Sequence, residues 1–80
     1  MTKEQIIEKA LEQGIQVKEA TYGIFNPEPV FSVEPADAQR FAYREGMYHV
    51  SCNRSRSELL SGIRLMAERM KIELVGMPSA

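Results

Sequence analysis

The 80 residues carry 10 basic and 11 acidic side chains, for a net charge of -1, and 44% of them are hydrophobic. These values predict one folded domain with a small core, and they exclude a disordered chain. No stretch approaches the roughly 18 apolar residues of a membrane span, and no secretory signal is recognisable. A single cysteine, Cys52, cannot form an internal disulfide, so we expect a cytoplasmic location.

Charge is unevenly distributed along the chain. Residues 1–38 carry three Lys against seven Asp or Glu, whereas residues 39–71 carry all six Arg and Lys71 against three Glu. An arginine side chain can grip a carboxylate or a phosphate through two parallel hydrogen bonds. The distribution therefore predicts a charged partner for the second half of the chain. Pairing of the unlike halves of two copies would also give a homo-oligomer.

The first expected elements are a helix and a hairpin. Thr2 and Gln5 have the spacing of a capping box, Gly14 suits a helix end, and between them apolar residues recur at Ile6, Ile7, Ala10 and Leu11. Residues 15–25 are rich in β-branched and aromatic side chains, which favours a strand. A turn with two prolines at residues 26–29 then leads to a second strand over residues 30–33. We expect the two strands to pair.

The middle of the chain predicts a second helix and a third strand. Pro35 suits the first turn of a helix that would end near Gly46 and bury Ala38, Phe41 and Ala42. Residues 47–52 alternate as a half-buried strand does, with Tyr48 and Val50 on one side and His49 and Ser51 on the other.

A longer amphipathic helix follows. Ser55 and Glu58 have the spacing of a second capping box, and an apolar stripe then repeats over residues 59–70. The stripe consists of Leu59, Leu60, Ile63, Met66, Ala67 and Met70. We expect it to form the core together with Ile6, Phe31, Phe41 and Val50.

Two alternatives fit residues 71–76. Leu74 and Met77 would extend the apolar seam of the helix, whereas Ile72–Val75 has the composition of a short strand, which we favour. The sequence therefore predicts an α+β fold, as a small single domain over residues 1–77 with the order α-β-β-α-β-α-(β). We expect a three- or four-stranded sheet with helices mainly on one face, and a flexible tail at residues 78–80.

Residues 49–57 form the first candidate site. They run from a strand into a helix N-terminus, where free backbone N–H groups attract anions, and they include Arg54 and Arg56, which have no evident structural task. A phosphatase-type loop needs an arginine six residues after its cysteine, but Glu58 stands there, so we assign no family. The arginines could lower the pKa of Cys52, although burial suits a free cysteine better. For His49 we expect half-buried packing.

A second cluster interleaves arginines with tyrosines, as protein interfaces and single-stranded nucleic-acid sites do. Together the two clusters give the predicted partner-binding residues Arg40, Tyr43, Arg44, Tyr48, Arg54 and Arg56.

These features predict a small protein-interaction module, of adaptor or inhibitor type, that docks an Arg- and Tyr-bearing face on an acidic partner surface. The alternative is a nucleic-acid or phosphate-binding protein using the same face. A pI near 5.8 and the lack of a nucleic-acid-binding motif weigh against that alternative. The sequence shows no catalytic constellation and no metal-ligand spacing. We therefore expect no enzymatic activity, no cofactor, no metal and no membrane partner.

Overall fold

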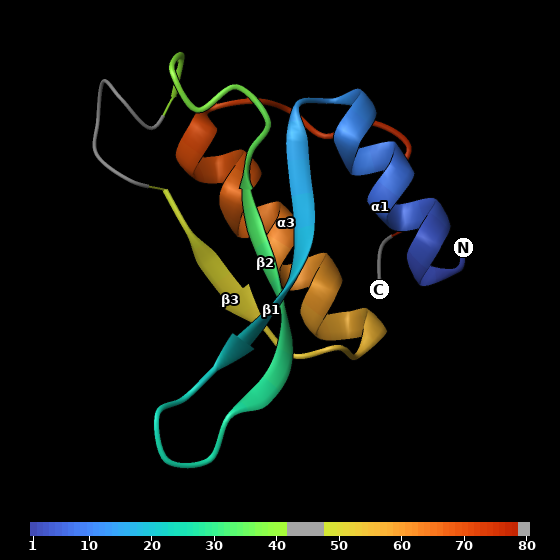
Figure 1. Ribbon diagram of the computed structural model, residues 1–80. Helices are drawn as coiled ribbons and strands as arrows, with labels where there is room; N and C mark the ends of the chain where they lie inside the picture. The colour runs from blue at the N-terminus through green and yellow to red at the C-terminus, as the bar shows by residue number, and fades with distance from the viewer. Residues whose placement is uncertain (42–47, 79–80) are drawn as a thin grey trace.

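The computed structural model describes residues 1–41 and 48–78 and shows an α+β domain in which two helices accompany a three-stranded sheet (Figure 1). The elements are α1 (Lys3–Glu12), β1 (Ile15–Tyr22), β2 (Glu28–Pro35), β3 (Val50–Cys52) and α3 (Arg56–Met70). The predicted fold class is therefore confirmed, but two of the predicted elements are absent from this part of the chain. No helix within the described ranges is long and apolar enough to cross a bilayer.

The sheet is antiparallel and has the order β1-β2-β3. β1 pairs with β2 over their full lengths, from Ile15 opposite Pro35 to Tyr22 opposite Glu28, which confirms the predicted hairpin. β3 covers only residues 31–33 of β2. Pro35 is therefore the last residue of β2 and does not begin a helix as predicted. It lies beyond the residues that pair on both sides, where a missing backbone donor is tolerated best.

The predicted second helix is wrong where the structure describes it. Residues 38–41 form a single turn, and Asp37 Oδ1 in front of it accepts a hydrogen bond of 3.0 Å from the Arg40 backbone N–H. The Asp37 carbonyl accepts a second bond, of 3.3 Å, from the Phe41 N–H. The remainder of that prediction, residues 42–46, lies outside the described residues, as does Met47 at the start of the predicted third strand. Tyr48 and His49 precede β3, which begins at Val50.

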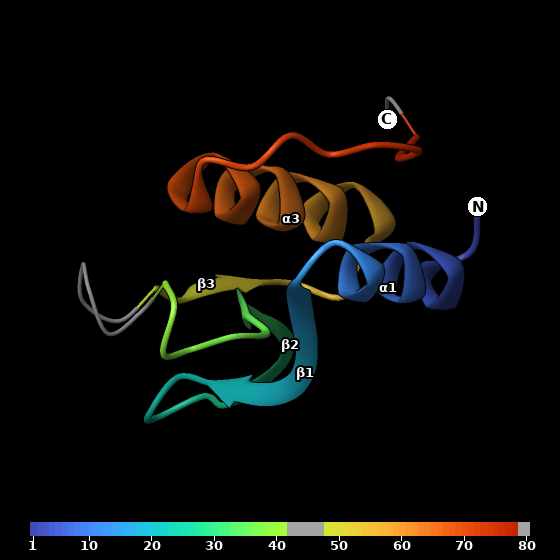
Figure 2. The same ribbon diagram turned by 90° about the horizontal axis from the view of Figure 1, so that it is seen from above.

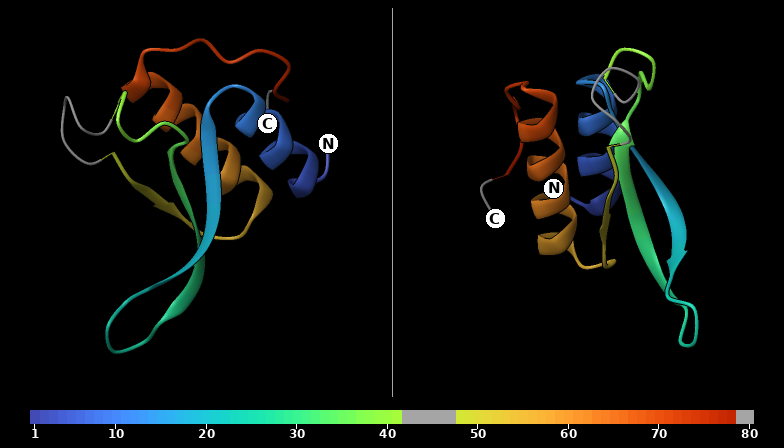
Figure 3. Two further views of the ribbon diagram at one scale, coloured as in Figure 1. Left: turned by 45° about the horizontal axis from the view of Figure 1, so that its top comes forward. Right: turned by 90° about the vertical axis from the view of Figure 1, so that its left-hand side faces the viewer.

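Both helices cover the same face of the sheet (Figures 2 and 3). The face turned away from them is called the open face below. Every residue of the predicted stripe on α3 is buried and packs with Ile6, Ile15, Phe31 and Val33. Phe41, Tyr48 and Val50 are half-buried against this core. The predicted core is therefore confirmed, with Phe41 and Val50 at its margin.

Side chains fix the start of each helix. Thr2 and Gln5 form the predicted capping box, with both reciprocal hydrogen bonds present. At α3 the Ser55 hydroxyl accepts from the Glu58 backbone N–H at 3.3 Å, as predicted. The Ser55 N–H, however, donates to Asn53 Oδ1 at 2.8 Å, so Asn53 takes the part that the capping box assigned to the Glu58 side chain.

The C-terminal segment is neither a strand nor a continuation of α3. Lys71 adopts a left-handed conformation with φ 58°, which ends the helix. The chain then runs along the side of α3 that faces away from the sheet (Figure 2), where the described part of the chain has no strand. Ile72 and Leu74 are half-buried and Glu73 and Val75 are exposed. The segment thus has the alternation of a strand without a strand partner.

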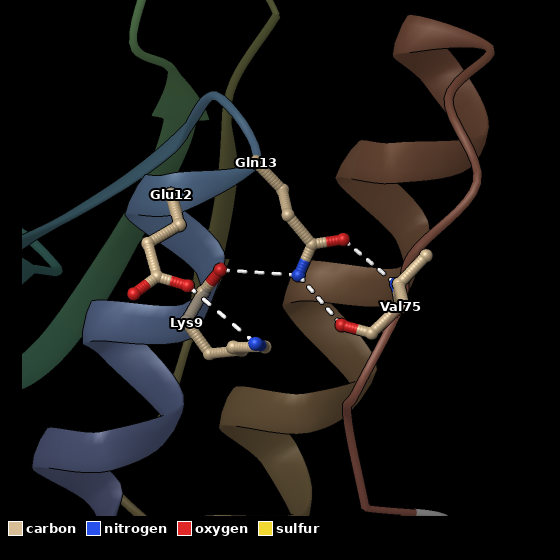
Figure 4. Close-up of polar contacts among 4 residues, drawn as sticks. All are labelled: Lys9, Glu12, Gln13 and Val75. Carbon is tan, nitrogen blue, oxygen red and sulfur yellow. Dashed lines mark hydrogen bonds and ion pairs between the residues drawn. The ribbon is translucent and has the colours of Figure 1, made fainter.

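One glutamine replaces the missing strand partner. Gln13, the C-cap of α1, donates from Nε2 to the Val75 carbonyl at 2.9 Å and accepts at Oε1 from the Val75 N–H at 2.7 Å (Figure 4). Nε2 also donates to the Lys9 carbonyl at 3.1 Å, which orients the amide. Further along, the carbonyl of half-buried Pro78 accepts a hydrogen bond from Arg64. The segment is therefore tied to both helices; Ser79 and Ala80 lie outside the described residues.

Candidate interaction surface

Arg54 has a structural task that the sequence did not reveal. Its guanidinium forms an ion pair of 2.8 Å with Glu19 of β1 and lies over the Phe31 ring, 5.4 Å from the centroid. The side chain therefore covers the end of the core and joins β1 to the loop that precedes α3. Because Glu19 belongs to the acidic half of the sequence, part of the charge polarity is neutralised within the fold.

Other arginines bind backbone carbonyls of distant segments. Arg56 Nε donates to the Met1 carbonyl at 3.1 Å, and Arg69 donates to the His49 carbonyl at 3.3 Å. Together with Arg64, which binds the C-terminal segment, they connect α3 to the start of the chain, to the approach to β3 and to the chain end. The expectation that Arg56 has no structural task is thus wrong as well.

The predicted partner-binding residues are dispersed in the structure. Arg40 is exposed and lies over the Phe41 ring, at 5.0 Å from its centroid. The turn that carries it lies toward the start of β3, whereas residues 53–56 follow the end of that strand (Figure 1). Tyr48 is half-buried against the core. Tyr43 and Arg44 lie outside the described residues, so a single face that unites all six residues is not observed.

Cys52 and His49 are on opposite sides of the sheet. The Cys52 thiol is buried on the helix side, where it donates to the Phe31 carbonyl at 3.5 Å, and burial, with a smaller contribution from the Glu58 charge, raises its pKa. A pKa lowered by neighbouring arginines is therefore excluded. His49 is exposed, so its predicted half-burial is wrong. Its Nδ1 lies 3.0 Å from Ser32 Oγ and its Nε2 3.0 Å from Ser51 Oγ.

The most conspicuous surface feature is the end of the β1–β2 hairpin, which projects beyond the helices (Figures 1 and 3). Residues 23–27 form this hairpin tip and contain two large apolar side chains, Ile24 and Phe25. These are 91% and 92% exposed, and Tyr22 beside them is 66% exposed. Isolated apolar residues are common on protein surfaces, but a contiguous group on a protruding element is typical of an interaction site.

The backbone of the hairpin tip is closely specified. Gly23 has φ 108°, a conformation that other residues rarely adopt, and a Cβ atom there would lie only 2.8 Å from the Asn26 carbonyl oxygen. Pro27 and Pro29 restrict the returning strand. The apolar side chains are therefore presented on a restrained turn, which lowers the entropy lost when they bind.

A hollow of about 500 Å3 adjoins the hairpin. Its lining residues are Tyr22, Val30, His49, Ser51, Cys52 and Asn53. The registers place Val30, Ser32 and Ser51 on the opposite side of the sheet from Phe31 and Cys52, and so on the open face. A second hollow, of about 390 Å3, lies beside the Lys18–Glu34 ion pair and is lined in part by Tyr48.

Comparison of the chain with protein-family models, curated proteins and solved structures finds no match. The residues that the structure describes also contain no group of His, Cys, Asp and Glu that could hold a metal ion. Function must therefore be inferred from the surface itself. Sequence reasoning missed the hairpin tip because Ile24 and Phe25 were assigned to a strand, although Gly23 in front of them and Asn26-Pro27 behind them marked a turn.

Proposed function

We propose that the protein is a small interaction module that docks the hairpin tip into an apolar pocket on a partner protein. The observation that carries the proposal is the near-complete exposure of Ile24 and Phe25 on a turn whose conformation requires Gly23. Large apolar side chains anchored in a pocket are the usual source of affinity at protein interfaces. The proposal keeps the interaction role predicted from the sequence but moves its centre from the arginines to the hairpin.

The size of the apolar group sets the affinity that it can supply. Full burial of one such side chain contributes roughly 1.5 to 3 kcal/mol, so Ile24 and Phe25 together contribute about 3 to 6 kcal/mol. Association costs an estimated 4 to 15 kcal/mol in lost translational and rotational freedom. The hairpin tip therefore acts as an anchor that needs surrounding contacts, and exposed Tyr22 and Glu28 are placed to supply them.

The arginines support the nucleic-acid alternative less well than their number suggested. Arg54 is paired with Glu19, and Arg56 binds the Met1 carbonyl. Arg40 is exposed in the turn after β2, whereas Arg54 and Arg56 follow β3, and this arrangement does not favour one continuous basic surface. A phosphate-binding role would require such a surface. The buried Cys52 thiol is compatible with the cytoplasmic location that we continue to propose.

Site-specific crosslinking in cells tests the proposal. A photoreactive phenylalanine analogue at position 25 should give a protein adduct that survives nuclease treatment, because its ring would lie within the partner's pocket. The same analogue at position 65 is the matched control, since Leu65 is 41% exposed but lies on α3, away from the hairpin. Equal crosslinking at the two positions would refute the proposal. An adduct to nucleic acid, or binding that falls steeply with salt concentration, would favour the alternative.

A further inference from the structure

We propose that the hollow beside the hairpin receives the hairpin tip of a second copy of this chain, so that two copies form a two-fold symmetric dimer. The inference rests on the proposed function, because it assumes that Ile24 and Phe25 act as docking groups. It goes further by assigning a recess for them and a partner, which is the chain itself.

The arrangement of the open face supports a symmetric contact. The hollow is lined by Tyr22, directly before the hairpin tip, by Val30 of β2, and by His49, Ser51 and Asn53, which belong to β3 or flank it. Tyr22 lines the hollow and directly precedes the hairpin tip, so the protruding apolar element and the hollow adjoin each other. A two-fold axis relates two such neighbouring features so that each tip meets the hollow of the other copy.

The lining of the hollow suits an apolar occupant. Its volume of about 500 Å3 lies within the range of clefts that hold small organic molecules, roughly 300 to 1,000 Å3, and is ample for a phenylalanine ring. None of its six lining residues is Asp, Glu, Lys or Arg, and Val30 and Tyr22 offer apolar and aromatic contacts. The hydroxyl of Ser51 and the amide of Asn53 leave a polar margin, as at the rim of most interfaces.

The few charged side chains on the hairpin tip and around the hollow are compatible with contact between two copies of the chain. They favour a second copy over a membrane surface as the partner. Among residues 20–30 the only charged side chain is Glu28, so the tip carries no basic group that would attract anionic lipid. In the dimer, each tip enters a recess without carboxylates, and the net charge of -1 per chain gives little repulsion. Symmetry also buries the two apolar side chains of both copies for a single loss of translational freedom.

Analytical ultracentrifugation of the purified chain tests the inference. We expect the mass to rise from monomer to dimer as the concentration increases from micromolar toward millimolar. Phe25→Ser removes the anchor and Ser51→Trp fills the recess, so each should weaken dimerisation by at least about tenfold, as expected for a central interface residue. Leu65→Ser, the matched surface control, should change it by less than about twofold. Circular dichroism of each variant must show the wild-type fold.

A mixture of the two variants gives the sharper test. Phe25→Ser keeps an intact recess and Ser51→Trp keeps an intact tip, so the mixed pair retains one of the two contacts. The mixture should therefore associate more strongly than either variant alone. A wild type that stays monomeric at every concentration, or a dimer insensitive to Ser51→Trp, would overturn the inference. If crosslinking from position 25 still captures another protein in that case, the proposed function stands without it.

Discussion

Replacing Gly62 by alanine tests how closely α3 approaches the sheet. Gly62 is buried in the middle of α3, and a Cβ atom there would lie 3.2 Å from Cys52 Sγ and 3.4 Å from Val33 Cγ2. Alanine is favoured over glycine in a helix by about 1 kcal/mol, whereas overpacking a core costs about 1 to 3 kcal/mol. We therefore expect Gly62→Ala to destabilise the protein by about 0 to 2 kcal/mol in the wild-type background.

Removal of the Cys52 sulfur should turn the effect of Gly62→Ala on stability from destabilising to stabilising. In a Cys52→Ala background the nearest remaining atoms are Val33 Cγ2 at 3.4 Å and the Cβ of residue 52 at 3.5 Å, which are near ordinary contact distances. Gly62→Ala should then stabilise by about 0.5 to 1 kcal/mol through helix propensity alone. Urea unfolding of the four proteins measures both effects and their coupling. Effects of Gly62→Ala that agree within about 0.3 kcal/mol in the two backgrounds would refute the close contact with the thiol.

Four further predictions follow from particular contacts. Ile63→Ala should lower the free energy of unfolding by about 2 to 5 kcal/mol, because Ile63 is fully buried; an unchanged denaturation midpoint would contradict this. Arg54→Glu should cost about 1 kcal/mol in thermal unfolding, since the ion pair is partly exposed, and adding Glu19→Arg should recover part of the loss. Gln13→Ala should speed hydrogen exchange in the C-terminal segment and leave the strands protected; uniform acceleration would argue against a local tie. Because the folded pKa of Cys52 is raised, the unfolded thiol ionises first, so stability should fall as pH rises above about 8.5, and Cys52→Ala should reduce that slope.

The periodic parts of the fold were predictable because local pattern and tertiary packing agree there. The apolar stripe of α3 repeats on one face over residues 59–70, and Ser55 marks the start of the helix, so both the helix boundary and the buried face could be inferred. The hairpin followed equally from β-rich segments around a turn with prolines. In such segments the conformation favoured by local sequence is also the one that packs well in the core.

The C-terminal segment shows where the same reasoning fails. The β-rich composition of residues 72–75 predicts a strand, but the structure forms none there, although half-buried Ile72 and Leu74 alternate with exposed neighbours. A strand, however, also needs a free sheet edge, and Lys71 directs the chain to the far side of α3. Whether an edge is within reach depends on the tertiary course of the chain, which residues 72–75 do not encode. The glutamine that binds the segment instead lies 62 positions away in the sequence.

The candidate site was mispredicted for a related reason. Counting charges along the sequence shows that acidic and basic residues lie in different halves, but it does not show which of them form ion pairs. Arg54 contacts Glu19 because β1, β2 and the residues after β3 lie side by side. The hairpin tip was overlooked because an apolar pair between strand-like residues suggests a strand. Its exposure depends on the length of the arm relative to the helices, which a local pattern does not contain.

The fold also explains why arginine rather than lysine predominates in the second half of the chain. Arg56, Arg64 and Arg69 each donate to a backbone carbonyl from a distant segment, and Arg54 combines an ion pair with packing on an aromatic ring. A planar guanidinium with several donors suits both tasks, whereas a lysine ammonium is more strongly hydrated and cannot lie flat on a ring. In a domain with a small core, such ties secure segments that packing alone would leave loose. The arginines thus have sufficient reason to be present without a charged partner, whereas Ile24 and Phe25 contribute nothing visible to the core. An interaction partner is therefore a better explanation for the hairpin tip than for the basic half of the sequence.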